Sequence, residues 1–440
     1  MSAGTRSFRV APAAAVAGAI TVPGDKSISH RAVMLGGIAR GVTEVSGFLP
    51  GADTLATAQI LRDLGVVIER PALTELIVHG VGLHGLRASA AALDCGNAGT
   101  AMRLLAGLLA GQRFASRLIG DESLSRRPMR RVLDPLRQMG AVIEATPAGT
   151  APLEIAPAAG LRGIDYTCPV ASAQVKSCVL LAGLYAEGET RVTEPAATRD
   201  YTERMLAALG ADVEVAGLSV RLRPGRELQA GPIRVPGDFS SAAFFLVAGA
   251  IAPRGELLIR NVGLNPRRTG LLDTLLDMGA DIRIVDRREI AGEPVGDLCV
   301  RASQLRAVEV PEARVPDMID EFPAFAIAAA CAEGVSRVRG AHELRVKESD
   351  RIAAMARGLV TLGVEVEEYP DGMAISGRER LGAGVIDSRG DHRIAMSFAL
   401  AALRASGEIR ILDCANVDTS FPGFAELSGS VGVDIAVEQA

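Results

Sequence analysis

Side chains that bind anions are concentrated in a few short stretches of this sequence. The stretch at 21–32 reads TVPGDKSISHRA and places Lys26, Ser27 and Arg31 just after a Pro-Gly-Asp turn. Five further stretches carry Lys, Arg, Ser, Gln or Asn at similar density: CGNAGTAMR at 95–103, LSRRPM at 124–129, VASAQVKS at 170–177, LRVKESDR at 344–351 and RGDHR at 389–393. Lysine and arginine form charge-assisted hydrogen bonds with phosphate and carboxylate groups. Together the stretches predict a site for a small ligand with several negative charges.

Each stretch also has an ordinary structural explanation when it is taken alone. DKS fits a helix start with a solvated lysine, and GNAGT fits a tight turn in which Asn97 bonds to nearby backbone. KESDR fits a surface helix cap with charge pairs one turn apart. Asp320 and Glu321 fit a helix cap that is followed by Pro323 in the first turn. The interpretation as a ligand site therefore depends on the joint position of the stretches and not on any one of them.

Composition argues against several classes of protein. The formal net charge of −5, the 3% aromatic content and the absence of Trp argue against nucleic-acid binding. The six cysteines form no C-x-x-C pair and the five histidines have no metal-ligand spacing, which favours reduced thiols in a cytoplasm and no metal. GDKS lacks the contiguous Gly-Lys-Ser of a nucleotide-binding P-loop. No apolar run is long enough to span a membrane, and the apolar segment near residue 15 is too short and Pro-interrupted to favour a signal peptide.

An internal repeat is the strongest indicator of the fold. A phrase of the form L-x-x-L/M-G-A/V-x-I/V recurs six times, the last time imperfectly, with its glycine at positions 65, 140, 210, 279, 363 and 432. Each copy is preceded by an Ala-rich apolar helix, a β-branched strand and a second helix with apolar residues three and four apart. The glycine is the expected residue just after that second helix. The first helix is apolar nearly all round and is expected to be buried.

The six units group into two halves. VPGD occurs at 22–25 and again at 235–238, half a chain apart, and we interpret the two copies as crossovers between domains. The predicted domains are 23–236, with units one to three, and 1–22 plus 237–440, with units four to six. The predicted fold class is α/β (α+β), with repeats of a βαβαββ type. Helix starts attract anions, so equivalent helix starts are expected to collect the charged stretches near a ligand that binds between the domains.

With these motifs in place, the chain resembles the enolpyruvyl transferase family, and within it the 5-enolpyruvylshikimate-3-phosphate synthases, or 3-phosphoshikimate 1-carboxyvinyltransferases. PGDKSISHR, GNAGTAMR, RRPM, SAQVKS, RVKESDR, GDHRIAMSFA and TSFPGF occur in the family's order and extend over nearly the whole chain. The resemblance implies two domains of three repeated units that close on the ligands. It implies transfer of the enolpyruvyl group of phosphoenolpyruvate to the 5-hydroxyl of shikimate 3-phosphate, in the shikimate pathway of aromatic amino-acid biosynthesis. No metal or organic cofactor is implied.

The resemblance also assigns site residues. It implies that shikimate 3-phosphate contacts Lys26, Ser27, Arg31, Ser172, Gln174, Arg199, Asp320 and Lys347. It implies that phosphoenolpyruvate contacts Lys26, Gly99, Arg127, Gln174, Arg351 and Arg393. The implied catalytic residues are Asp320 as proton acceptor, Lys347 as a relay, Glu348 as a second acid or base, and Lys26. These residue types suit the reaction. The paired N–H groups of an arginine guanidinium match the oxygens of carboxylate and phosphate groups. The addition also needs an acid and a base that act on different atoms.

Four positions depart from the pattern of many family members. Leu104 stands where many have Pro, Ala173 where many have Ser, Thr419 where many have Lys, and Glu343 where some have Asn. The resemblance implies sensitivity to the inhibitor glyphosate, because family members with Gly at position 99 generally bind glyphosate and Ala at this position crowds the inhibitor.

Two other functions stay open on the sequence. The first is the sister enolpyruvyl transferase that acts on a UDP-sugar, which has the same fold and uses a loop cysteine, for which Cys95 is the candidate. The second is a non-catalytic anion-binding protein, against which the acid and base candidates argue. The chain is expected to act as a cytoplasmic monomer on small molecules, without nucleic-acid or membrane partners.

Overall fold

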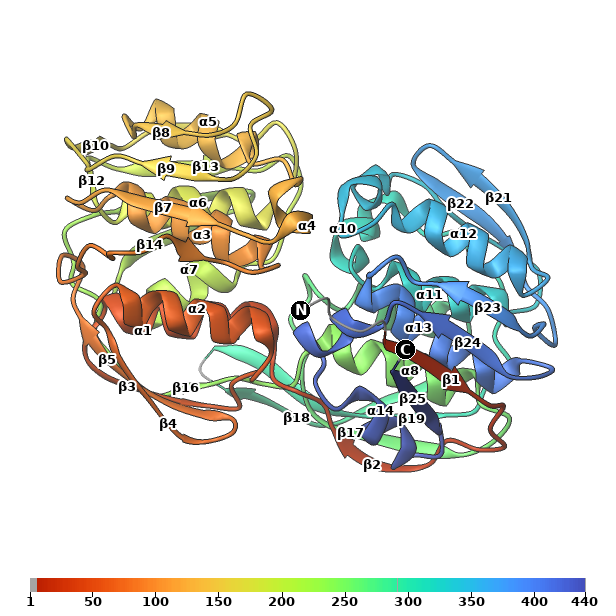
Figure 1. Cartoon of the computed structure of the whole chain (residues 1–440). Coiled ribbons are helices and arrows are strands. Elements are labelled where there is room, and N and C mark those ends of the chain that lie inside the picture. The colour runs from red at the N-terminus through yellow and green to blue at the C-terminus, as the bar shows by residue number, and fades with distance from the viewer. Residues whose placement is uncertain (1–5, 291, 440) are drawn as a thin grey trace. The chain divides into compact units, whose positions relative to one another are not determined.

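The computed structural model describes residues 6–290 and 292–439, and it divides into two compact units. One unit runs from Gly24 to Val235 and is called the inserted unit below. The other combines the segment that ends at Pro23 with the segment that begins at Pro236, and is called the split unit (Figure 1). Each unit has its own hydrophobic core, so each is described by itself.

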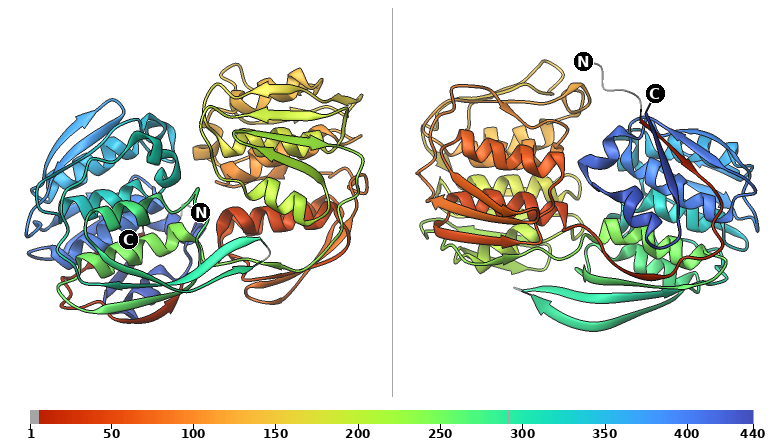
Figure 2. Two further views of the ribbon diagram at one scale, coloured as in Figure 1. Left: turned by 180° about the vertical axis from the view of Figure 1, so that it is seen from behind. Right: turned by 60° about the horizontal axis from the view of Figure 1, so that its bottom comes forward.

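Three helices form the centre of each unit. In the inserted unit they are α1 (Lys26–Ile38), α3 (Gly99–Ala110) and α6 (Ala173–Gly183). In the split unit they are α8 (Phe239–Ile251), α11 (Phe322–Ala330) and α13 (His392–Ala401). Every residue of α8 and of α11 is buried, which confirms the prediction that helices apolar on all sides lie in the interior. Figure 2 shows these helices inside each unit and the sheets around them.

A second helix completes each repeat: α2 (Ala52–Asp63), α5 (Arg130–Gln138), α7 (Tyr201–Ala208), α9 (Gly270–Asp277), α12 (Arg351–Thr361) and α14 (Phe424–Gly429). In the first five repeats, the glycine of the repeated phrase directly follows the C-cap residue of the second helix, and its φ lies between 79° and 98°. A side chain rarely adopts this backbone conformation, which explains why glycine recurs there. The sixth repeat differs, because Gly432 lies two residues beyond the cap at Ser430.

Six sheets follow one pattern of strand order and direction, five of them completely and one in part. Five of them join a parallel pair to two antiparallel strands: β16-β3-β5-β4, β6-β7-β9-β8, β11-β13-β15-β14, β2-β17-β19-β18 and β23-β24-β1-β25. The sixth, β20-β22-β21, is antiparallel and carries isolated parallel bridges where a fourth strand would lie. Sheet geometry therefore follows the sequence repeat and confirms the α/β class with three repeats in each unit.

The strands of the inserted unit are β3 (Arg40–Ser46), β4 (Val67–Ala72), β5 (Glu75–Val81), β6 (Leu93–Asp94), β7 (Ser116–Ile119), β8 (Ile143–Glu144), β9 (Leu153–Ile155), β11 (Asp165–Thr167), β13 (Thr190–Thr193), β14 (Asp212–Ala216), β15 (Ser219–Arg223) and β16 (Ile233–Arg234), with the small pair β10 (Leu161–Arg162) and β12 (Ala186–Glu187). Those of the split unit are β1 (Arg6–Val10), β2 (Gly18–Thr21), β17 (Glu256–Gly263), β18 (Asp281–Ile290), β19 (Glu293–Arg301), β20 (Val335–Val338), β21 (Glu365–Tyr369), β22 (Gly372–Ser376), β23 (Gly384–Asp387), β24 (Ile409–Leu412) and β25 (Ile435–Gln439).

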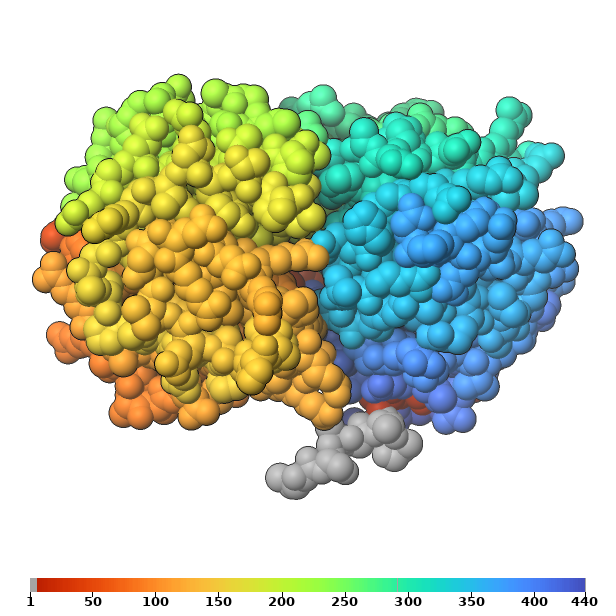
Figure 3. Space-filling model, turned by 90° about the horizontal axis from the view of Figure 1, so that it is seen from above, coloured from red at the N-terminus to blue at the C-terminus, as the bar shows by residue number. Residues whose placement is uncertain are grey.

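Short helices connect the larger elements: α4 (Glu122–Ser125), α10 (Val315–Met318) and the 3₁₀ turns η1 (Glu312–Arg314), η2 (His342–Val346), η3 (Ala402–Arg404) and η4 (Ala415–Thr419). On the face that Figure 3 shows, orange to green segments form most of the inserted unit and teal to blue segments form most of the split unit. No helix of the described chain is long and apolar enough to cross a membrane.

Candidate active site

Several of the predicted site residues lie at the starts of the central helices, whereas Arg127, Arg199 and Lys347 lie in connecting loops. In the inserted unit, Lys26 is the first residue of α1, Gly99 is the first of α3 and Gln174 is the second of α6. Asp25 caps α1 by accepting a hydrogen bond from the Ile28 amide at 2.8 Å, which fixes the chain just before Lys26. Helix starts present free N–H groups and partial positive charge, so the local fold of each repeat favours an anion at this end.

Lys26 is held by a partner that sequence analysis missed. Its ammonium forms an ion pair with Asp53, which lies in the first turn of α2 and is 5% exposed. Asp53 occurs in GADTLAT, which carries no cationic or glycine-rich pattern, so no sequence signal indicated it. The pair orients Lys26 at the start of α1 and rules out a freely solvated lysine.

Arg31 is almost completely buried in the inserted unit. It is 4% exposed, and its guanidinium donates to Thr202 Oγ1 at 2.7 Å, to Ser177 Oγ at 2.8 Å and to the Ser27 carbonyl at 2.9 Å. Burial lowers the pKa of Arg31 to about 10, against the opposing effect of nearby Glu203, so it remains protonated at neutral pH. Arg31 thus ties α1 to α6 and α7 behind Lys26 and Ser27.

A second group surrounds the start of α3. Gln174 donates to Thr100 Oγ1 at 3.0 Å and accepts from Arg103 NH1 at 2.6 Å. Arg127 NH2 donates to Asn97 Oδ1 at 2.6 Å. Arg103 belongs to the motif GNAGTAMR, but the motif alone did not indicate that Arg103 would bond to Gln174.

Gly99 lies against both of these arginines. A Cβ at position 99 would lie 3.1 Å from Arg127 NH1 and 3.4 Å from Arg103 NH1. Both distances are shorter than an ordinary contact, although the ends of the arginine side chains could shift to make room. Glycine at position 99 therefore leaves space between the two guanidinium groups.

The loop that carries Arg199 is anchored by a buried ion triad. Lys176 Nζ lies 2.7 Å from Glu194 and 2.7 Å from Glu203, and all three side chains are 3% exposed. Thr198 donates to Glu194 at 2.5 Å, just before Arg199. Burial disfavours the Lys176 ammonium, but the two carboxylates outweigh it and raise its pKa. Ser172, also predicted, caps α6 by accepting from the Val175 amide at 3.4 Å.

In the split unit, Asp320 lies at the centre of a cluster of cations. Its Oδ1 is 3.4 Å from Lys347 Nζ and 3.4 Å from Arg351 NH1, and its Oδ2 is 3.8 Å from Arg268 NH1. Arg393 NH1 donates to the Asp320 backbone carbonyl at 3.0 Å. Of the other four predicted residues of this unit, Lys347 and Arg351 therefore meet the Asp320 carboxyl group and Arg393 binds its backbone carbonyl, and Arg268 joins them without having been predicted.

Arg351 links Asp320 to Glu348 and to Asp391. Its NH2 donates to Glu348 Oε2 at 2.6 Å and its Nε to Asp391 Oδ2 at 2.9 Å, and its side chain is 1% exposed. Burial alone would lower the pKa of Arg351, but the carboxylates of Asp391, Glu348 and Asp320 raise it above the ordinary value. Arg351 is thus a permanent buried cation that holds the fifth predicted residue, Glu348, near Asp320.

Asp391 has two structural roles at the start of α13. It is fully buried, and Arg351 holds the pKa of its carboxyl below the usual value although burial opposes ionisation. Its Oδ1 accepts from the Arg393 amide at 3.0 Å and caps the helix. The RGDHR motif contained Asp391, and only the three-dimensional contacts show that it positions both arginines.

Glu321 does not act as the helix cap that its place in the sequence suggests. It is the residue before α11, but its side chain makes no capping hydrogen bond. It is 1% exposed, accepts a hydrogen bond from Ser240 and lies 3.7 Å from Arg393 NH1 and 3.9 Å from Arg268 NH2. Glu321 therefore belongs to the charge network behind Asp320.

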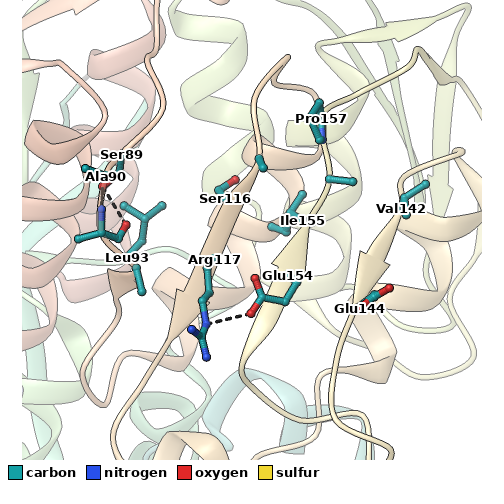
Figure 4. Close-up of a pocket in the computed structure, with 14 residues that line it drawn as sticks. Ser89, Ala90, Leu93, Ser116, Arg117, Val142, Glu144, Glu154, Ile155 and Pro157 are labelled. Carbon is teal, nitrogen blue, oxygen red and sulfur yellow. Dashed lines mark hydrogen bonds and ion pairs between the residues drawn. The ribbon is translucent and has the colours of Figure 1, made fainter.

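One hollow of about 540 Å³ lies elsewhere in the inserted unit. Residues of β7, β8 and β9 line it, together with Ser89 to Leu93, and none of the predicted site residues does so (Figure 4). Its charged contact is the pair of Arg117 and Glu154 at 2.9 Å, which is half exposed. Among the described residues, no group of three or more His, Cys, Asp or Glu side chains is arranged to hold a metal ion.

Two units of three repeats, with cations gathered at the starts of their central helices, are the architecture of enolpyruvyl transferases. The family model for EPSP synthase (3-phosphoshikimate 1-carboxyvinyltransferase) matches residues 10–427. A 3-phosphoshikimate 1-carboxyvinyltransferase from Methylococcus capsulatus is 60% identical over 430 residues, 98% of each chain. One from Xanthomonas oryzae pv. oryzae is 58% identical over 440 residues, all of both chains. The solved structure of an EPSP synthase from Acinetobacter baumannii has a TM-score of 0.90 at 51% identity and covers 99% of this chain and 100% of that one.

The chain therefore belongs to the EPSP synthase family. It is a transferase of the shikimate pathway, in which the enolpyruvyl group of phosphoenolpyruvate passes to shikimate 3-phosphate. This finding confirms the enzyme class and the reaction expected from the sequence and removes the non-catalytic alternative. It leaves the role of each site residue as a proposal.

Proposed function

We propose that Asp320 and Glu348 carry the proton steps of the enolpyruvyl transfer. The observation that supports this most directly is the setting of Asp320, whose Oδ1 lies 3.4 Å from both Lys347 Nζ and Arg351 NH1. Nearby cations favour an ionised carboxylate, which can accept a proton from a hydroxyl group. Glu348 is 2.6 Å from the same arginine, so a second carboxylate is available for a different atom of the substrates.

Phosphoenolpyruvate is expected to bind a set of arginines together with Gln174 and Lys26. Arg127, Arg351 and Arg393 offer planar forks that match its carboxylate and phosphate groups, and Gln174 and Lys26 add further donors. Gly99 keeps the start of α3 clear for this small anion, since a Cβ there would lie 3.1 Å from Arg127 NH1.

Shikimate 3-phosphate is expected to bind a second set of residues. The set is Lys26, Ser27, Arg31, Ser172, Gln174, Arg199, Asp320 and Lys347. It combines cations for the phosphate and carboxylate with hydroxyl and amide groups for the ring. Because Lys26 is ion-paired with Asp53, its ammonium is held in place before the ligand arrives.

The reaction is an addition followed by an elimination. The 5-hydroxyl of shikimate 3-phosphate attacks C2 of phosphoenolpyruvate and gives its proton to Asp320, with Lys347 beside it as a relay. Binding of the anionic phosphoenolpyruvate offsets the charge of Arg351 and lets Glu348 take up a proton, which Glu348 donates to C3 to form a methyl group. The tetrahedral intermediate then loses phosphate, which takes the proton held by Asp320, while a methyl proton returns to Glu348. Lys26 and the arginines stabilise the negative charge on the phosphate.

Hydrogen exchange at C3 of phosphoenolpyruvate tests this division of roles. In deuterated water with both substrates, the native enzyme is expected to release phosphate and to place deuterium at C3. Glu348→Gln should lose most of this exchange, and Asp320→Asn should lose both phosphate release and exchange, by about a hundredfold or more. Glu365→Gln, an exposed carboxylate on β21, is the control. Unchanged exchange in both site variants would contradict the proposal.

The second candidate function is the UDP-sugar reaction, and the burial of Cys95 argues against it. That reaction depends on a reactive loop cysteine, whereas Cys95 is 0% exposed and burial raises the pKa of its thiol. A reactive cysteine needs a lowered pKa and access to its substrate. The structure of this residue therefore supports the shikimate 3-phosphate reaction.

We propose further that the enzyme works as a monomer in the cytoplasm. The six cysteines are free thiols, which suits a reducing compartment. Sedimentation at micromolar protein with both substrates present tests the oligomeric state.

A further inference from the structure

A buried arginine that no sequence motif indicated lies behind Asp320. Arg268 belongs to the loop between β17 and α9, and its side chain is 4% exposed. Its NH2 donates to Asp238 Oδ1 at 3.0 Å and to Ser240 Oγ at 2.5 Å. These bonds fix the guanidinium at the start of α8, where Asp238 is the capping residue.

The other end of this guanidinium faces the acid/base candidate. Arg268 NH1 lies 3.8 Å from Asp320 Oδ2, whereas Lys347 and Arg351 lie 3.4 Å from Oδ1. Each oxygen of Asp320 therefore has its own cation, and the one on Oδ2 is itself buried and anchored. Such an arrangement restricts rotation of the carboxyl group and keeps its charge in place.

The surrounding charges show why this cation is needed. Asp238, Asp320 and Glu321 bring three carboxylates to the buried side of the site, and Arg268 contacts all three. Other charged groups near Asp320 include Lys347, Arg351, Arg393 and, through Arg351, Glu348 and Asp391. Without Arg268, Asp320 would keep Lys347 and Arg351 on Oδ1 but would lose the cation on Oδ2, and a carboxylate with fewer cations beside it takes up a proton more readily.

We propose that Arg268 is a positioning residue for the reaction: it orients Asp320 from the buried side and favours its ionised form. The inference rests on the proposed function, in which Asp320 accepts the proton of the attacking hydroxyl. Arg268 does not touch either substrate in this proposal. Its loss should reduce the chemical step and leave both Michaelis constants nearly unchanged.

Steady-state kinetics with a matched pair of variants test the proposal. Arg268→Gln is expected to lower kcat by about tenfold or more, with KM for each substrate within about twofold. The acid limb of its kcat–pH profile should move upward by about one pH unit, because Asp320 has lost an adjacent cation. Arg268→Lys should recover part of the rate. Arg267→Gln is the control, since Arg267 is the neighbouring residue, is 41% exposed and pairs with Asp317.

A charge-balanced variant keeps the test decisive if Arg268→Gln does not fold. Arg268→Gln with Asp238→Asn removes one cation and one carboxylate, and Asn still caps a helix. The folded double variant should keep the reduced kcat and the shifted acid limb. A native kcat and pH profile in this variant would overturn the inference. Asp320→Asn, measured in parallel, separates the two claims: if it stays active the proposed role of Asp320 fails, and if it is inactive while the Arg268 variants are normal only this inference fails.

Discussion

Single residues in this enzyme depend on partners that are distant in the sequence. Lys26 is held by Asp53, Gln174 by Arg103 and Asp320 by Arg268. Each partner is buried or partly buried, so it acts by fixing its neighbour. The residues that bear charge toward a ligand occur in short motifs, whereas the residues that orient them are scattered.

His30 gives a residue-scale prediction about pH. It is fully buried on α1, its Nδ1 lies 2.8 Å from Thr57 Oγ1, and burial together with Lys26 and Arg31 lowers its pKa well below 6.5. Below about pH 6.5 the unfolded chain binds a proton at this histidine and the folded chain does not, so the free energy of unfolding should decrease as the pH falls. The expected slope is about 1.4 kcal/mol per pH unit, and above pH 6.5 the contribution vanishes.

Denaturant unfolding between pH 7.5 and 5 measures this slope. His30→Asn should unfold with a shallower dependence on pH below 6.5 than the native chain, whatever its stability at pH 7.5. His342→Asn removes an exposed imidazole and is the control. Equal slopes in the His30 variant and the native chain would show that another group governs the acid sensitivity.

At the scale of elements, sequence patterns correctly predicted features that depend on a single helix. The Ala-rich segments indicated the buried helices, and the repeated glycines indicated where the second helices end. The motifs also indicated which helix starts bear charge. The exact strand pairings at the crossovers could not be derived, because β16 pairs with β3 and β2 pairs with β17, in each case a strand far away in the chain. Arg268 and Glu321 were missed for the same reason, since their contacts join three or more separate segments.

Close packing between two central helices gives an element-scale prediction. A Cβ at Gly107 on α3 would lie 2.2 Å from the Cys178 carbonyl oxygen on α6, which is too close for any side chain. Gly107→Ala should therefore force the helices apart and lower the free energy of unfolding by about 1–3 kcal/mol. This range is a net value, because it already includes the gain of about 1 kcal/mol from the higher helix propensity of alanine.

Gly429→Ala is the matched control for that change. Gly429 ends α14, and a Cβ there would meet no atom closer than Asp434 Oδ1 at 3.6 Å. Its stability should change by less than about 0.5 kcal/mol. Thermal unfolding of both variants decides the matter, and equal stability of the two would mean that α3 and α6 can separate without cost.

At the scale of the whole molecule, the chain consists of two units with separate cores. The core of the inserted unit extends from Ile28 to Val235, and the core of the split unit includes residues from both ends of the chain, such as Phe8 and Phe421. Sequence repeats predicted three repeats on each side of the second VPGD. We propose that 23–236 and 1–22 with 237–440 are domains in the strict sense, each able to fold alone.

Expression of residues 24–235 alone tests this proposal. The two ends of this segment lie close together, because the Val235 amide donates to the Ser46 carbonyl at 2.8 Å and a Cβ at Gly24 would lie 3.2 Å from Val235 Cγ1. β16 closes its sheet by pairing with β3 in parallel. The isolated segment should therefore unfold cooperatively on heating, with the far-ultraviolet circular dichroism of a mixed α/β protein and without transferase activity. A shorter segment that ends at residue 231 lacks β16 and should melt at a lower temperature. A non-cooperative melt of residues 24–235 would show that the inserted unit requires the split unit in order to fold.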